Sequence, residues 1–330
     1  MPLTRGETIA LGVAVESTRG TFAEPQDFIR LREPVGLQTL VEKVDIKEAT
    51  GSGMDTQGQE LIKSKVEGTV AFNLRFRTIG YLLKSLLGGL SSATEAGETV
   101  VYRHAFSLDT SVLQPSLSFA LAKGELQHKA VNGGIVSSLE LNFPLEDVIN
   151  GTATLMGRTE ANHADWTPAF ASDDTLVPRH YMTIKLAADV AGLSGATAIP
   201  ITEASIALDR QTREKMVLSS LSPTDFIARL LNVSGSFTWE KDADTYRDLA
   251  VDNTARALQI DIVNTAQDIG VGSNPTLTIV LPKVTLNYSE TRPLDDVVTE
   301  QIEFKAHYDE TEAEGVTMSL VNEKANYAAA

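Results

Sequence analysis

The stretch LNYSETRPLDDVVTEQIEFKAHY, residues 286–308, resembles an earlier stretch, LNFPLEDVINGTATLMG, at residues 141–157. The triplet LNF matches LNY, and the corner PLEDV matches PLDDV. Each copy reads as a strand, a polar turn and a second strand, because aromatic and β-branched residues stand on both sides of the corner. This pattern is typical of antiparallel β-structure, and its recurrence predicts an internal duplication.

Other segments repeat in the same order. VEGTV at 66–70 matches VSGSF at 233–237, and TIGYL at 78–82 matches TYRDL at 245–249 at the same offset. Three more expected correspondences are 28–31 with 181–186, 40–47 with 201–208, and PSLSF at 115–119 with PTLTI at 275–279. We therefore predict a mainly β protein with two tandem β-sandwich or barrel domains, each with one flanking α-helix. A single large sandwich with repetitive strands is the alternative.

The loss of alternation between the two repeats suggests the domain boundaries. The predicted parts are an N-terminal arm at 1–21, a first β domain at 22–157, a linker at 158–175, a second β domain at 176–322 and a C-terminal tail at 323–330.

Two loops and one helix stand out within this plan. Residues 79–90 carry an apolar stripe that Thr78 can cap and that Gly88 and Gly89 end. Residues 49–60 have no periodicity, and residues 209–225 take their place in the second repeat. Loops of this length in a compact domain are usually there to contact something.

The composition excludes several classes of function. The chain has 28 Lys and Arg against 44 Asp and Glu, a net charge of −16, which argues against a nucleic-acid partner held by phosphate contacts. It has no cysteine, so disulfides, thiolate metal sites and a cysteine nucleophile are excluded, which fits folding in the cytosol. No signal peptide is evident, and the apolar run at 79–90 is too short for a membrane span.

No catalytic, cofactor or metal site is predicted. The histidines lack ligand spacing, and the adjacent acids Asp295 and Asp296 are better explained as a structural turn than as a carboxylate pair. Asp242 and Asp244 stand where capping of a helix explains them. One face of the strand at 301–309 carries Glu303, Lys305, His307 and Asp309. This face is either solvated or the lining of an acidic channel.

Four segments together resemble a known family. They are GVAVESTRGT at 12–21, GTV at 68–70 followed by YLLKSLLG at 81–88, the strand and corner at 135–147, and FKAHYD at 304–309 with SLVN at 319–322. In overall pattern, over nearly the whole chain, they are similar to the tail tube, or major tail, proteins of tailed bacteriophages with long non-contractile tails. The similarity involves no invariant motif.

This resemblance implies a structural virion protein. Tube proteins of this kind form rings that stack into the tail tube, through which genomic DNA passes on ejection without specific binding. Two tube domains per chain would give a homotrimeric ring with pseudo-sixfold symmetry in place of a hexamer of chains. The expected partners are other copies of the chain and the tail tip, tape measure and tail terminator proteins. The expected location is the virion tail, assembled in the host cytoplasm, with no cofactor and no membrane.

The resemblance also assigns roles to residues. The loops would bridge ring to ring through Gly51, Met54, Asp55, Gln57, Gln211, Arg213 and Lys215. Glu303, Lys305 and Asp309 would line the lumen. The alternative from another class is a secreted or surface β-sandwich that binds carbohydrate or acts as an adhesin. An enzyme ranks third, because no triad or metal set is present.

Overall fold

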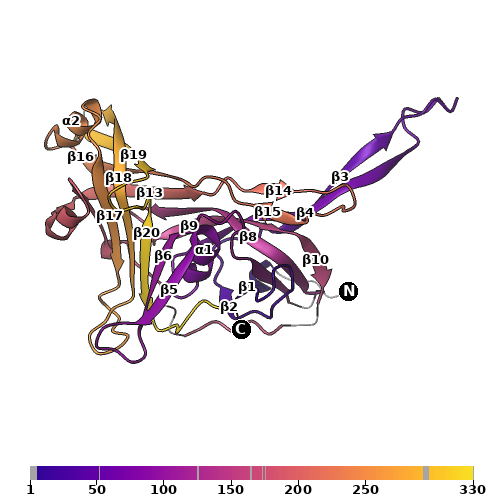
Figure 1. The fold of residues 1–330 in the computed structure, drawn as a ribbon, viewed down its shortest axis with the longest axis horizontal. Helices are drawn as coiled ribbons and strands as arrows, with labels where there is room; N and C mark the ends of the chain where they lie inside the picture. The colour runs from indigo at the N-terminus through magenta and orange to yellow at the C-terminus, as the bar shows by residue number, and fades with distance from the viewer. Residues whose placement is uncertain are drawn as a thin grey trace.

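A computed structural model describes residues 6–51, 53–124, 126–163, 166–172, 174, 176–292 and 297–329. Over these residues the chain is mainly β, with two α-helices, as predicted (Figure 1). Neither helix in the described part of the chain is long and apolar enough to cross a membrane.

The first half of the chain supplies these elements: a 3-10 turn η1 (Gly6–Thr8), β1 (Ile9–Val15), β2 (Asp27–Ile29), β3 (Gln38–Ile46), β4 (Gly58–Asn73), α1 (Ile79–Leu87), β5 (Gly88–Thr94), β6 (Tyr102–Leu108), β7 (Leu117–Lys123), β8 (Lys129–Phe143), β9 (Asn150–Gly157) and β10 (Thr159–Asn162).

The second half supplies these: η2 (Arg179–Tyr181), β11 (Met182–Ala187), η3 (Ala191–Gly195), β12 (Ala198–Ile199), β13 (Ile201–Asp209), β14 (Arg213–Lys215), β15 (Asp225–Ile227), β16 (Asn232–Glu240), α2 (Thr245–Val251), β17 (Arg256–Val263), β18 (Thr276–Thr291), β19 (Thr299–His307) and β20 (Thr317–Asn322).

The strands follow the alternation of the sequence. In β8, Leu139, Leu141 and Phe143 are buried, while Glu140 and Asn142 between them point to the other face. The helix α1 buries its apolar stripe under the sheet, and it ends where Gly88 adopts a φ of 92°. Glycine accepts this left-handed conformation without the steric penalty of a Cβ, so the predicted end of the helix is correct.

The two halves share one order of strand pairing. In the first half the order is β3–β4–β9–β8–β7–β1, and in the second it is β13–β16–β19–β18–β17–β11. The helix follows β4 in the first half and the equivalent strand β16 in the second. All of these pairs are antiparallel.

Two junctions join the halves into one sheet. The end of β8 pairs with β13, from Ser138 with Asp209 to Phe143 with Ala204. At the second junction, β6 of the first half pairs with β20 of the second half. The hairpin of β5 and β6 has no counterpart in the second half, where only four residues separate α2 from β17.

Three predicted segments are placed differently. Residues 9–15, expected to belong to an arm, form the buried strand β1, because they are apolar on both faces and lie between β2 and β7. The expected linker contains β10, which pairs with β8. The expected C-terminal tail packs along the first half, where Tyr327 is fully buried.

Two of the sequence correspondences are also wrong in the structure. Residues 115–119 lead into β7, whereas residues 275–279 lead into β18, whose counterpart is β8. By pairing order, β11 corresponds to β1 and not to the strand at 28–31.

The opening repeat lies on equivalent strands but not in the same register. Leu286 shares a row with Phe304 and Gly235. The matching row of the first half holds Val136, Leu155 and Gly68, so Val136 and not Leu141 takes the place of Leu286. The second corner, PLDDV, falls at residues 293–297, of which 293–296 lie outside the described residues.

Candidate functional site

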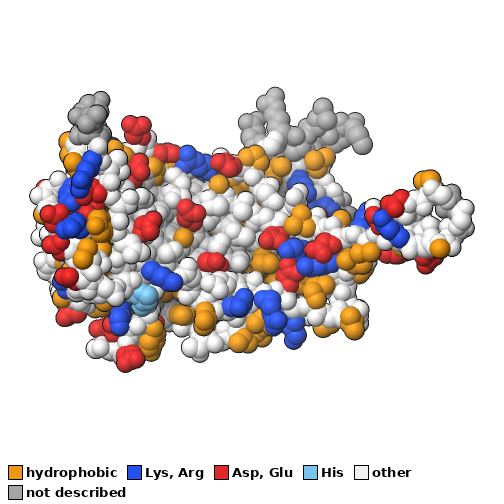
Figure 2. Space-filling model, turned by 90° about the horizontal axis from the view of Figure 1, so that it is seen from above, with side chains coloured by type: hydrophobic (Ala, Val, Ile, Leu, Met, Phe, Trp, Pro, Cys, Tyr) orange, Lys and Arg blue, Asp and Glu red, His pale blue; other side chains and the backbone are white. Residues whose placement is uncertain are grey.

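A broad polar face covers the sheet on the side away from the core. Along one row it carries Asn73, Asn150, Asn142, Ser205, Ser236 and Glu303, contributed by both halves. Figure 2 shows the molecule from above, with uncharged surface predominating in the middle and both acidic and basic side chains scattered over it. The face runs without interruption across the β8–β13 junction.

The few charges on this face are mainly acidic. Glu140, Glu203 and Glu303 are exposed on it, and Lys305 is an exposed cation beside them. Two of the three predicted lumen residues, Glu303 and Lys305, are therefore on one face. The third, Asp309, lies beyond β19 in a turn, where its carboxylate accepts hydrogen bonds from the backbone N–H groups of Thr311 at 2.7 Å and Glu312 at 3.2 Å.

The predicted loop at 49–60 forms the tip of a long hairpin and the first residues of β4. The strands β3 and β4 extend beyond the body of the molecule (Figure 1). At the tip, the Gln57 amide bonds both the N–H and the C=O of Glu48, and Asp55 pairs with Lys47 at 3.0 Å. Gly51, Met54, Asp55 and Gln57 thus lie together at this tip, and polar contacts define its shape.

The base of the hairpin is held by the second half of the chain. Glu214 of β14 pairs with Lys63 at 2.5 Å and with Lys65 at 2.6 Å, and the N–H of Ser64 donates to the carbonyl of Leu221 at 2.8 Å. Burial opposes ionisation of Glu214, but the two lysines outweigh it and lower the pKa of its carboxyl. The second predicted loop therefore holds the base of the hairpin whose tip carries the first.

The loop at 210–231 is itself anchored to the first half. Phe226 is buried against Ile135 and Met156, and Asp225 pairs with Arg19 at 2.6 Å. Among the predicted contact residues, Gln211 adopts a φ of 48° in the turn after β13. Arg213 and Lys215 form the ends of the small strand β14.

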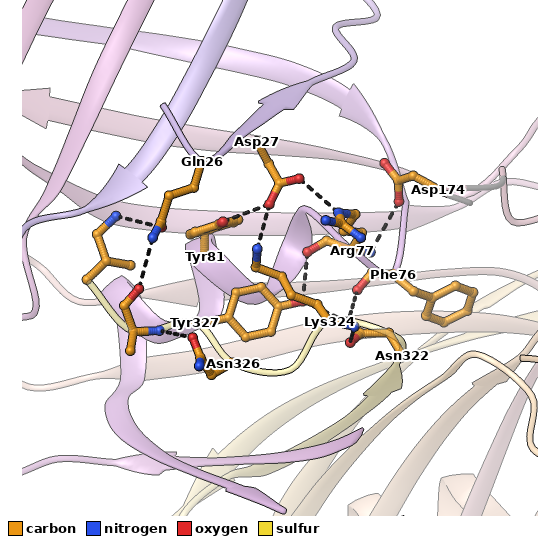
Figure 3. Close-up of polar contacts among 12 residues, drawn as sticks. Gln26, Asp27, Phe76, Arg77, Tyr81, Asp174, Asn322, Lys324, Asn326 and Tyr327 are labelled. Atoms are coloured by element: carbon orange, nitrogen blue, oxygen red, sulfur yellow. Dashed lines mark hydrogen bonds and ion pairs between the residues drawn. The ribbon is translucent and has the colours of Figure 1, made fainter. Parts of the chain in front are cut away.

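A buried polar cluster holds residues 322–327 against α1 and its neighbours (Figure 3). The Asp27 carboxylate accepts hydrogen bonds from Arg77 at 2.8 Å, Tyr81 at 2.7 Å and Lys324 at 2.8 Å. Burial opposes ionisation of Asp27, yet these three donors leave its pKa below the ordinary value. The carboxylate is therefore charged at neutral pH.

Tyr327 and His104 complete this cluster. The Tyr327 hydroxyl donates to the carbonyl of Arg77 at 2.7 Å and accepts from Asn322 at 2.7 Å. His104 lies between Ser92 and the carbonyl of Lys324, 2.9 Å from its Nε2, and burial lowers its pKa despite these hydrogen bonds. Because every one of these groups is used in packing, the cluster is structural.

Among the described residues, two open sheet edges are equivalent to the edges that pair at the β8–β13 junction. One is the end of β18, and the other is the start of β3, with Tyr288 and Thr39 exposed on them. Their equivalents at the internal junction are Leu139 and Leu208, which are buried because β8 and β13 pair there. The equivalence follows from the rows, since Tyr288 pairs with Ile302 as Leu139 pairs with Ala153.

Among the described residues, no group of three or more His, Asp and Glu side chains is arranged to hold a metal ion. A family model described as phage tail tube protein matches residues 6–306. The chain belongs to the phage tail tube protein family. It is a structural protein of the bacteriophage virion tail, and this family is not an enzyme family. No curated protein matches the sequence.

Sequence reasoning missed several functional features of this tail tube protein. The anchor Phe226 and the ion pairs of Glu214 bring segments far apart in the chain into contact, which periodicity within a strand does not reveal. The Asp27 cluster depends on residue 324, at the other end of the chain. One signal was present: Gly80 interrupts an otherwise strong helix, as it would where another group packs closely.

Proposed function

We propose that this tail tube protein closes into rings of three chains, each chain supplying two tandem, duplicated tube domains. The rings stack into the tube of a long non-contractile tail. Genomic DNA passes through the lumen without specific binding. Assembly takes place in the host cytoplasm, with tail tip, tape measure and tail terminator proteins at the ends or inside the tube.

The observation that carries this proposal is the β8–β13 junction. Two halves with one strand order are already paired side by side within the chain. The same two kinds of edge are left open at the far sides, where β18 corresponds to β8 and β3 corresponds to β13. An open β edge is a ready template for strand pairing, and a ring removes all such edges.

The rows of the sheet support one register for the proposed contact between chains. Leu139 faces Leu208 at the internal junction. The equivalent pair is Tyr288 of one chain with Thr39 of the next, because Thr39 pairs with Val66 as Leu208 pairs with Val233. Ring closure would cover Tyr288, which is 39% exposed, just as Leu139 is covered at 1% exposure.

In such a ring the polar face lines the lumen. Glu140, Glu203 and Glu303 give it a negative charge that repels DNA phosphates, while asparagine, serine and threonine leave few cations to grip them. The repulsion acts over a Debye length of about 8 Å at physiological salt. Lys305 belongs to this lining, and Asp309 stands at its border.

The hairpin of β3 and β4 bridges one ring to the next in this proposal. Deleting residues 51–58, which include Gly51, Met54, Asp55 and Gln57, is expected to leave folded rings that stack poorly. Tube growth at the normal rate in electron micrographs would contradict this role.

Cysteine cross-linking tests the ring directly, because the natural chain has no cysteine. The double variant Thr39→Cys with Tyr288→Cys places two thiols on directly opposed strands, at a separation that a disulfide spans. On oxidation we expect a ladder on a non-reducing gel that ends at the covalent trimer. A ladder that continues to six chains would replace the trimer by a hexamer, and uncross-linked monomer would reject the junction.

Electron microscopy of tails and of the purified protein supplies the second test. We expect stacked rings with pseudo-sixfold symmetry, and tails with a bare tube and no contractile sheath. Persistent monomers at high concentration would count against the proposed assembly, and a sheathed tail would overturn the tail type alone.

A further inference from the structure

An apolar knob projects from the loop between β14 and β15. It consists of Met216, Val217, Leu218 and Leu221. Leu218 is fully exposed, and the other three each expose more than a third of their surface. The segment from 216 to 222 contains no charged residue. A run of exposed apolar side chains on a protein surface usually marks a place where another surface docks.

The knob is held rigidly. Phe226 fixes the end of the loop in the core of the first half, and Leu221 accepts a hydrogen bond from Ser64 of β4. The pairing of β14 with β15 fixes the two ends of the loop next to each other. Because few loop torsions remain to be ordered on contact, the loop is prepared for binding.

A hollow with a mixed polar and apolar lining lies elsewhere between the two halves. It has a volume of about 280 Å³. Its apolar side is formed at the end of β8 by Phe143, Pro144 and Leu145, and in the second half by Met182 and Ile201. Its polar side is formed by Arg179, His180 and Thr202. Leu145 is exposed at its rim. The hollow is of the right size to accept a leucine side chain and its neighbours.

One strand connects the hollow with the knob. β13 begins at Ile201, which lines the hollow, and ends at Asp209, after which the chain enters the knob loop. Nine strand residues at about 3.3 Å each separate the two sites by roughly 30 Å. β13 crosses the sheet that forms the wall of the proposed ring, so the knob and the hollow lie at opposite ends of that wall.

We propose that the knob of one chain inserts into the hollow of a second copy in the adjacent ring. This inference rests on the proposed ring and names its axial contact. A knob at one end and a complementary hollow at the other make a head-to-tail contact, which repeats without closing and produces a filament. The knob is uncharged, so it can pack on the apolar side of the hollow, while Arg179 and His180 on the other side are exposed.

Substitution at the knob separates stacking from ring formation. Leu218→Asp should leave the rings of three intact, as seen by mass photometry, and reduce the mean tube length at least tenfold in micrographs. Val271→Asp is the matched control, because Val271 is an equally exposed apolar residue on a different loop. Tubes of normal length from Leu218→Asp would overturn the axial contact and leave the ring proposal standing.

Mixed cross-linking tests the proposed contact without disrupting it. Chains with Leu218→Cys are mixed with chains with Leu145→Cys and oxidised. We expect a disulfide dimer in the mixture and none in either variant alone, with Val271→Cys and Leu145→Cys as the negative pair. Rings that form without this cross-link would refute the contact, whereas loss of the rings themselves would count against the proposed function.

Discussion

The ring of Tyr327 lies directly on Gly80, so a Cβ at position 80 would overlap the ring. Glycine inside a helix costs about 1 kcal/mol relative to alanine. At Gly80 this cost is offset by the close approach of the C-terminal segment, whose tyrosine is completely buried. The first helix and the last residues of the chain are therefore shaped for each other.

Gly80→Ala is expected to destabilise the protein by about 1–3 kcal/mol, the usual effect of overpacking, although alanine is the better helix former. Thermal unfolding measures the change. In the Tyr327→Ala background the same substitution should become neutral or stabilising by about 0.5–1 kcal/mol, since the obstacle is gone. Equal effects in both backgrounds would show that Tyr327 is not the cause.

The Asp27 cluster predicts a loss of stability in acid. The pKa of Asp27 in the folded protein is below its ordinary value of 3.8, so its contribution is present above that pH and is lost as the pH falls through the folded pKa. Asp27→Asn should cost about 3 kcal/mol at pH 7, because it removes the buried carboxylate charge that pairs with Arg77 and Lys324. The difference from the wild type should shrink in denaturant melts below pH 4. A constant difference would contradict the assignment.

The base of the hairpin predicts a local effect. Glu214→Gln removes the charge between Lys63 and Lys65 and should accelerate hydrogen exchange in β3 and β4, with a loss of about 1 kcal/mol in overall stability. The control is Asp55→Asn at the exposed tip, where breaking the pair with Lys47 should change stability by less than about 0.5 kcal/mol. Exchange that stays slow in Glu214→Gln would mean that other contacts hold the hairpin.

If the polar face lines the lumen, a positive charge on that face should slow DNA passage more than one placed off it. Glu140→Lys with Glu303→Lys should place cations on the proposed lumen, so tubes should assemble normally while DNA delivery slows at low salt and recovers as salt increases. Asp309→Lys, off the sheet face, should have the weaker effect. DNA delivery at the wild-type rate from the double variant would remove these two residues from the lumen.

The alternation in β8 and the apolar stripe and glycines at 79–89 were sufficient to predict β8 and α1, although Thr78 makes no capping side-chain hydrogen bond. Local hydrophobic periodicity determines which face is buried, and glycine determines where α1 ends. Register was harder to predict, because Leu141 matches Leu286 in sequence, whereas strand pairing places Val136 in the position equivalent to Leu286. A triplet of common strand residues can recur several positions out of step on equivalent strands.

The long-range contacts were beyond sequence reasoning for a different reason. Residues 9–15 were predicted to be an arm because their strand partners in β7 come about a hundred residues later in the sequence. The tail was predicted to be separate because Tyr327 packs on α1, which lies much earlier in the sequence. Of the predicted site residues, Glu303 and Lys305 share a sheet face because strand alternation is local. Asp309 left that face because the strand ends at His307.

The junction between β8 and β13 has a kinetic consequence. It forms as each chain folds, at a rate that does not depend on the concentration of subunits, because the two halves are tethered. In a ring of three chains, every second junction is then already made before the chains meet. Nucleation requires the encounter of three bodies where separate domains would require six, and each encounter avoided also avoids its loss of translational and rotational entropy. Ring formation should therefore begin at a lower protein concentration, and with a shallower dependence on it, than for a tube built from single domains.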